Sequence, residues 1–197
     1  IKAGEYEVIV AGGMENMTRA PYLIANGRSG YRMGDGLLED HLMRDGLICT
    51  VNQYHMGMTA ENIAAKYGVS REDQDAYALE SQRRTQMAIE AGLFEEEIVP
   101  VPIPQKRGDP VLFASEEHPR PETTLEALAV LRPAFREDGT VTAGNASGVN
   151  DAAAALVVAS RDFAESRSLK PLARVVGYAA AALDPAYMGM GPYHATL

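Results

Sequence analysis

The hydrophobic residues of this chain gather into two short continuous runs, one near each end. Val8–Ala11 is a mostly β-branched run closed by Gly12-Gly13, and Ala152–Ala159 is a second apolar run. Short apolar runs bounded by turn residues are typical of strands that are buried on both faces, as in a parallel sheet. Each run is therefore predicted to be a strand of a parallel sheet in an α/β protein.

The residues after the second run predict a helix followed by another strand. Ser160-Arg161-Asp162 resembles a helix start, and Leu172–Tyr178 is an apolar segment of strand length. Strand, helix and strand at this spacing are typical of a βαβ unit.

The stretch from Met14 to Val149 has a different pattern, richer in glycine, proline and charge. Two segments within it predict helices, Thr59–Tyr67 and Ser70–Ala91, the second with a capping box at its start and Gly92 at its end. Ile98–Pro110 favours extended or edge-strand backbone, because its prolines have no N–H to donate. A stretch of this length cannot be a simple connection, so we expect it to carry structure of its own.

Composition indicates a folded, acidic protein. Of its 197 residues, 46% are hydrophobic and 23% are charged, which is enough for a core. The net charge of -9 argues against nucleic acid or an anionic membrane as a partner, because either would need a basic face. No apolar stretch is long enough to cross a bilayer. The single cysteine, Cys49, cannot form an internal disulfide, which favours a cytoplasmic location. A chain that begins at Ile1 and enters a strand almost at once indicates an upstream segment.

Few residues form a recognisable catalytic pattern. Cys49 and His55 could make a thiolate–imidazole pair, but no known nucleophile signature surrounds Cys49, so the favoured interpretation is a small buried side chain. For His55, taken alone, the favoured interpretation is a structural histidine. The acidic runs Glu95–Glu97 and Glu116-Glu117 are predicted to be a solvated face. The histidines lack metal-ligand spacing and no phosphate-binding glycine motif occurs, so neither a metal site nor nucleotide hydrolysis is predicted.

The most informative stretch is Thr142–Asp151, where small and polar residues lead directly into the second apolar run. Such a loop lets the backbone approach a ligand closely. A tight connection stabilised by Asn and Ser turn chemistry explains the same composition equally well.

Four segments together resemble the thiolase family in sequence, order and spacing. They are Val8–Met17, Tyr54–Asn62, Leu131–Phe135 and Val141–Asp151. The similarity continues through the helix containing Ser81-Gln82, the turn Ala91–Phe94 and the segment Asp184–Pro192, and so covers essentially the whole chain.

The resemblance implies a partial thiolase-like αβαβα layered fold with an inserted α+β loop domain. Residues 1–17 would be a strand of the N-terminal thiolase half, and 18–148 the loop domain that covers coenzyme A (CoA). Residues 149–197 would hold the remainder of that half and the start of a linker to a C-terminal half.

The resemblance also implies binding residues but no catalytic residue. The matching positions for CoA contacts are Arg120, Leu131, Phe135, Ala143 and Ser147, and those that shape the acyl pocket are His55, Met56 and Met188. These residue types suit the ligand, because Arg binds phosphate, apolar side chains bind adenine or pantetheine, and Ser binds an amide.

The activity implied is acyl transfer between acyl-CoA molecules without a tightly bound cofactor. In the family one cysteine carries the acyl group, a second cysteine and a histidine handle the proton, and an Asn contributes to an oxyanion hole. In family order these groups lie before Ile1 and after Leu197, so the segment alone is expected to be inert. Tyr54–Gly57 is similar to the acetyl-CoA C-acetyltransferase type, which joins two acetyl-CoA into acetoacetyl-CoA and CoA.

Three alternatives stay open at this point. The segment could be a non-catalytic module for CoA binding or oligomerisation, because loop domains in this family help to build dimers of dimers. It could belong to a 3-ketoacyl-CoA thiolase of fatty-acid β-oxidation. An isolated fragment could also expose a sheet edge and apolar layers that only a partner, such as its flanking segments, would cover.

Overall fold

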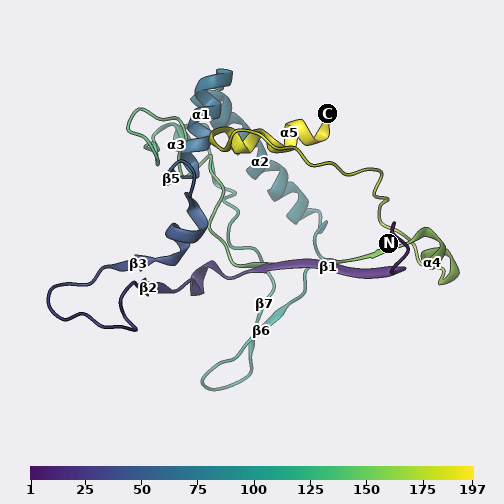
Figure 1. Ribbon diagram of the computed structural model, residues 1–197. Helices are drawn as coiled ribbons and strands as arrows, with labels where there is room; N and C mark the ends of the chain where they lie inside the picture. The colour runs from purple at the N-terminus through teal and green to yellow at the C-terminus, as the bar shows by residue number, and fades with distance from the viewer. The chain divides into compact units, whose positions relative to one another are not determined.

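Both apolar runs are strands in the computed structural model, which describes all residues, 1–197. β1 (Val8–Glu15) pairs with β8 (Ala152–Ala159), so that segments from opposite ends of the sequence run side by side (Figure 1). The pairing is antiparallel, with Ile9 opposite Val158, and the parallel sheet predicted from the sequence is wrong for these two strands. An apolar run specifies a strand but not the direction of its neighbour, which depends on how the chain returns.

The prediction that β1 is buried on both faces is also wrong for this chain. Every residue of β1 is exposed, and Val10 keeps 72% of its accessible surface. β1 and β8 form a two-stranded sheet, and a sheet face becomes buried only where another layer packs on it.

The helix after β8 forms as predicted, but the following strand does not. α4 (Arg161–Ser166) is capped by Ser160, whose hydroxyl accepts a hydrogen bond from the N–H of Phe163 at 3.1 Å. Residues 173–184 belong to no helix or strand, and Leu172 is fully exposed, so the predicted βαβ unit is wrong. A strand needs hydrogen-bond partners on a neighbouring strand, and β-branched residues supply only a tendency toward extended backbone.

Contacts divide the chain into two compact units, Gly57–Gly148 and the remainder, Ile1–Met56 with Val149–Leu197. The remaining elements of the Ile1–Met56 and Val149–Leu197 unit are short. They are η1 (Met17–Arg19), β2 (Tyr22–Ile24) paired with β3 (Leu38–Asp40), the π-helix η2 (Leu42–Leu47), β4 (Ile48–Cys49) paired with β5 (Tyr54–His55), η3 (Pro185–Met190) and α5 (Gly191–Thr196).

The Gly57–Gly148 unit is built on the two helices that the sequence predicts. Its elements are α1 (Gly57–Tyr67), α2 (Arg71–Glu90), the hairpin of β6 (Val101–Ile103) with β7 (Val111–Phe113), and α3 (Leu125–Ala129). β6 lies inside the predicted edge strand and contains Pro102, as expected for an edge. The most buried side chains of this unit include Leu128 and Val141 but also Glu61, Asp75 and Thr142.

The start of α2 follows the predicted capping box. The Ser70 hydroxyl accepts the N–H of Asp73 at 3.1 Å, and the Asp73 carboxylate accepts the N–H of Ser70 at 3.3 Å. After the helix, Gly92 adopts φ of +67°, a left-handed conformation that glycine reaches without a steric penalty.

Replacing Ser70 by Ala is expected to destabilise the Gly57–Gly148 unit by about 1 kcal/mol, because the N–H of Asp73 loses its acceptor. Urea denaturation followed by far-UV circular dichroism measures the change. Ser70→Asn, which keeps a capping acceptor, serves as the matched control, and an equal loss in both variants would show that the cap is not the cause.

No helix of the chain combines the length and apolar character needed to span a membrane.

Candidate functional site

The loop that follows residue 139 is anchored by a buried carboxylate of α1. Glu61, which is 1% exposed, accepts hydrogen bonds from the N–H of Thr140 at 3.0 Å and from the N–H of Val141 at 2.9 Å. The Thr140 hydroxyl also donates to it at 3.2 Å. A carboxylate that accepts several N–H and O–H groups fixes the path of the backbone, because each of these bonds is charge-assisted.

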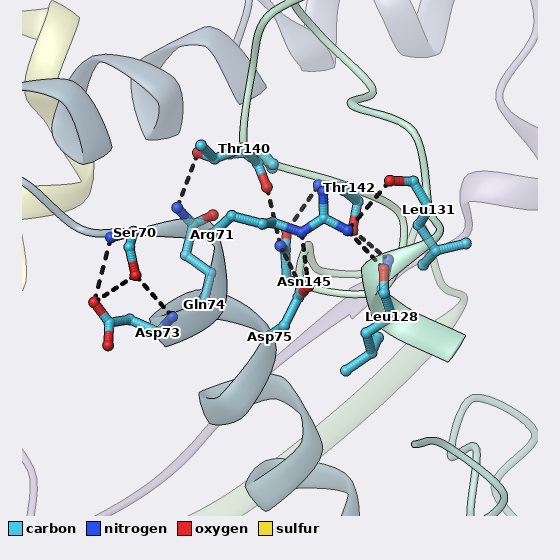
Figure 2. Close-up of polar contacts among 12 residues, drawn as sticks. Ser70, Arg71, Asp73, Gln74, Asp75, Leu128, Leu131, Thr140, Thr142 and Asn145 are labelled. Carbon is cyan, nitrogen blue, oxygen red and sulfur yellow. Dashed lines mark hydrogen bonds and ion pairs between the residues drawn. The ribbon is translucent and has the colours of Figure 1, made fainter. Parts of the chain in front are cut away.

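Asn145 folds the same loop back on itself and ties it to α2. Its Nδ2 donates to Oδ1 of Asp75 at 2.9 Å and to the carbonyl of Thr140 at 3.1 Å, and its Oδ1 accepts the N–H of Thr142 at 2.7 Å (Figure 2). The Thr142 hydroxyl in turn accepts the N–H of Gly144 at 3.2 Å. These bonds use both ends of the Asn145 amide, so its orientation is determined.

Arg71, the first residue of α2, joins this network to α3 and to the residues that follow it. Its Nε lies 2.7 Å from Oδ2 of Asp75, and its Nη2 donates to the carbonyls of Leu128 at 2.6 Å and Leu131 at 3.2 Å (Figure 2). The side chain of Leu131 also lies against Gly144, where an added Cβ would be 2.6 Å from Leu131 Cδ1. The network therefore joins α2, residues 128–131 and the loop 140–145.

The five residues expected to contact CoA all lie in the Gly57–Gly148 unit. Ala143 and Ser147 are exposed on the anchored loop, and Leu131 and Phe135 are half-buried beside it or against α1. Arg120 is exposed, and its N–H donates to Oε1 of Gln82 on α2 at 2.8 Å. The structure thus brings Leu131 next to the Ala143 loop and attaches Arg120 to the neighbouring helix.

A shallow hollow of about 270 Å³ lies on α2 beside the segment that follows Arg120. It is lined by Leu79, Gln82, Arg83, Gln86, Met87, Pro121 and Thr123. Its lining includes none of the five expected CoA contacts.

The three residues expected to shape an acyl pocket lie in the other unit. His55 is half-buried in β5 opposite Ile48, and Met56 donates its N–H to the carbonyl of Leu47 at 2.7 Å. Met188 lies in η3 and is 42% exposed.

Cys49 is half-buried in β4, so the prediction of a small buried side chain is wrong for this chain. Its Sγ accepts the N–H of Asn52 at 3.5 Å and the Nδ2 of Asn52 at 3.7 Å. The backbone donor of Asn52 contributes most to lowering the pKa of the Cys49 thiol, because a hydrogen bond to sulfur stabilises the thiolate.

The two acidic runs and Asp151 are charged groups outside this network. Glu95–Glu97 and Glu116-Glu117 are exposed, which confirms the solvated face. Asp151, at the end of the Thr142–Asp151 stretch, accepts the N–H of Thr18 at 2.9 Å, and this bond lowers the pKa of its carboxyl. No three His, Cys, Asp or Glu side chains come together in a group that could hold a metal ion.

Residues 1–162 match the model of the thiolase N-terminal domain. The chain belongs to the thiolase family. Acetyl-CoA acetyltransferases of Pseudomonas aeruginosa and Escherichia coli are each 54% identical to it over 100% of its length and 50% of theirs. The thiolase chain thus spans about half the length of the curated relatives it matches.

Solved thiolase structures confirm a thiolase-like α/β fold. An acetyl-CoA acetyltransferase from Syntrophomonas wolfei matches 98% of this chain and 48% of its own at 46% identity, with a TM-score of 0.90. Human mitochondrial 3-ketoacyl-CoA thiolase in complex with CoA also matches 98% of this chain and 48% of its own, at 46% identity and with a TM-score of 0.88.

Sequence reasoning missed the residues that anchor the loop of this thiolase chain. Glu61, Arg71 and Asp75 look like ordinary polar residues of two amphipathic helices, and the i,i+4 spacing of Arg71 and Asp75 is that of a surface ion pair. Their buried partners lie more than 50 positions later in the chain, as the separations of 57 and 79 residues show. A local pattern carries no signal for such contacts.

Proposed function

We propose that this chain is part of an acyltransferase of the acetyl-CoA C-acetyltransferase type, which joins two acetyl-CoA into acetoacetyl-CoA and CoA and also runs the reverse thiolysis. The names of its curated relatives support this, since two of them, at 54% identity, are acetyl-CoA acetyltransferases. The catalytic groups of that reaction are assigned to no residue of this chain.

One observation in the structure carries the proposal. The loop that exposes Ala143 and Ser147 is fixed from inside by Glu61 and Asn145, so small residues are presented on a backbone that is already ordered. A preorganised loop of small residues suits a long, flexible ligand, because binding then costs less ordering of the protein. A solved relative at 46% identity is in complex with CoA.

In this proposal the region 18–148 is the inserted loop domain that covers CoA as a substrate. Arg120 binds a phosphate, the apolar side chains of Leu131, Phe135 and Ala143 contact the adenine or pantetheine, and Ser147 binds an amide. The acyl pocket is shaped by His55, Met56 and Met188. The complete protein is a cytoplasmic homo-oligomer, a dimer of dimers, that acts in fatty acid metabolism.

Two other functions fit part of the findings. Human mitochondrial 3-ketoacyl-CoA thiolase is also 46% identical, with a TM-score of 0.89, which favours action on longer acyl chains. The anchored loop by itself would also suit a module that binds CoA, or builds oligomers, without turnover.

Thiolysis assays on the complete polypeptide distinguish these functions. Acetoacetyl-CoA is expected to be cleaved with kcat/KM about tenfold or more above that of 3-ketohexanoyl-CoA, because extra methylenes must fit a short pocket. The reverse preference would favour a 3-ketoacyl-CoA thiolase. CoA binding without turnover would leave only the binding module.

Arg120→Gln tests the phosphate contact in the same protein. Loss of a charge-assisted bond is expected to raise the Kd for CoA about tenfold, measured by isothermal titration calorimetry. Arg84→Gln is the matched control, because Arg84 is an exposed arginine of α2 that pairs with Glu80. Equal effects of the two substitutions would reject a specific role for Arg120.

A further inference from the structure

A single buried carboxylate connects the two stretches that carry proposed CoA contacts. Asp75 is 4% exposed, and each of its oxygens serves a different partner. Oδ2 lies 2.7 Å from Nε of Arg71, which holds the carbonyl of Leu131, and Oδ1 accepts Nδ2 of Asn145, which shapes the loop of Ala143 (Figure 2). No proposed CoA contact touches Asp75 directly in these bonds.

We propose that Asp75 is a positioning residue for CoA: through Arg71 on one side and Asn145 on the other, it fixes the Leu131 stretch and the Ala143–Ser147 loop at one spacing. This rests on the proposed function, because it assumes that both stretches contact CoA.

The polarity of the network makes a carboxylate necessary at position 75. The Arg71 guanidinium can only donate, and the Asn145 Nδ2 that faces Asp75 is also a donor. Asn145 cannot reverse its amide, because its Oδ1 accepts the N–H of Thr142 at 2.7 Å and its Nδ2 donates to the carbonyl of Thr140 at 3.1 Å. Two donors therefore converge on residue 75, and only a side chain with two acceptor oxygens satisfies both.

Substituting Asn at position 75 breaks one of the two links while keeping the size of the side chain. Its NH2 group must face either Arg71 or Asn145, and either arrangement places a donor against a donor. The Leu131 stretch and the Ala143 loop then lose their common anchor. Binding CoA must order them, which weakens affinity without changing the groups that make or break bonds.

The test compares wild type and Asp75→Asn in the complete polypeptide, at a temperature where both are folded by circular dichroism. The Kd for CoA, measured by isothermal titration calorimetry, and the KM for acetoacetyl-CoA are expected to rise about tenfold, with kcat unchanged. A purely structural role would lower stability and leave the Kd of the folded protein unchanged. An unchanged Kd, or a loss confined to kcat, overturns the proposal.

Glu80→Gln is the matched control on the same helix. Glu80 pairs with Arg83 and Arg84 at the surface of α2 and contacts no residue of the network through these bonds. Its Kd and KM are expected to equal those of wild type. A tenfold rise in this control would show that any lost carboxylate of α2 suffices, and the proposal would be rejected.

Asn145→Ala provides a second variant if Asp75→Asn does not fold. It leaves the Arg71–Asp75 pair and the Glu61 anchor in place. It removes the link from Asp75 to the loop, together with the bonds of the Asn145 side chain to Thr140 and Thr142. The same rise in Kd is expected. If neither variant folds, the network is structural and the proposal is rejected.

Different results would reject the role of Asp75 and the proposed acyltransferase function. CoA binding without turnover by wild type would reject the acyltransferase activity, while the Kd values of the variants would still decide the role of Asp75. Normal turnover with unchanged Kd in the variants would reject only the role of Asp75. Absence of CoA binding by wild type rejects both.

Discussion

Replacing Glu61 by Ala is expected to lower the free energy of unfolding of the Gly57–Gly148 unit by about 2–5 kcal/mol. The substitution leaves the N–H groups of Thr140 and Val141 without their acceptor, in a place where Glu61 is 1% exposed and Val141 is 6% exposed. Each buried donor without an acceptor costs about 1–3 kcal/mol, and the removed side chain adds a cavity.

Hydrogen–deuterium exchange measures this loss where it occurs. In Glu61→Ala the peptide that contains Thr140 and Val141 is expected to exchange faster, because loss of the Glu61 acceptor lowers the free energy of local opening. Peptides of the exposed hairpin β6–β7 are expected to be accelerated less, because they open locally without unfolding of the whole unit. Unchanged exchange at residues 140–141 would contradict the anchoring role.

Two matched variants separate charge from shape at this position. Glu61→Gln keeps the size of the side chain but turns one acceptor into a donor, so an intermediate loss is expected. Glu80→Gln removes a carboxylate whose two arginine partners lower its pKa to about 2, yet it lies at the surface, where water replaces the lost bonds. The urea midpoint of this control is expected to stay at the wild-type value.

Replacing Gly57 by Ala is expected to destabilise the same unit by about 1–3 kcal/mol, through overpacking. The three atoms nearest to an added Cβ all belong to the ring of Phe135, at distances too short for a real contact. A ring is rigid and cannot bend away as a flexible side chain could, so Phe135 must move as a whole. Because Phe135 is a proposed CoA contact, the Kd for CoA should rise together with the loss of stability.

A double-mutant cycle tests the Gly57 mechanism. Phe135→Leu combined with Gly57→Ala should recover part of the lost stability, since the smaller side chain leaves room for the methyl group. Gly46→Ala is the control, because an added Cβ there meets no atom within 4 Å and its φ is not positive. Additive losses in the cycle would mean that contact with Phe135 is not the source of the effect.

Polar side chains make up much of the buried interior of this chain. The most buried positions of the Gly57–Gly148 unit include Glu61, Thr59, Asp75 and Thr142, whereas many large apolar side chains of the chain are exposed. Buried polar groups of this kind give a unique arrangement only when every donor and acceptor is paired, and no buried side-chain nitrogen or oxygen of the chain lacks a partner. Single substitutions in the network are for that reason expected to have large effects.

Local features of the chain could be predicted from the sequence because neighbouring residues determine them. The capping box of Ser70 and Asp73, the end of α2 before Gly92 and the start of α4 after Ser160 depend on hydrogen bonds within a few positions. The positions of β1 and β8 followed from their apolar runs for the same reason. The expected CoA contacts came from resemblance to a family, and they remain predictions for this chain.

Features that depend on distant residues required the structure. β1 pairs with β8 in the antiparallel direction, and Leu172–Tyr178 forms no strand. Both results depend on which backbone segment is next to the run in the folded chain, and the sequence of an apolar run does not specify that segment. The sequence around Asp75 does not indicate that its carboxylate links two segments, because one of its two donors is Asn145, which lies 70 positions later in the chain. The sequence by itself determined the family, the helices with their caps and the residues expected at the ligand. Only the tertiary structure decided how strands pair and which buried carboxylates anchor the loop, because hydrogen bonds between residues far apart in the chain exist only once it has folded.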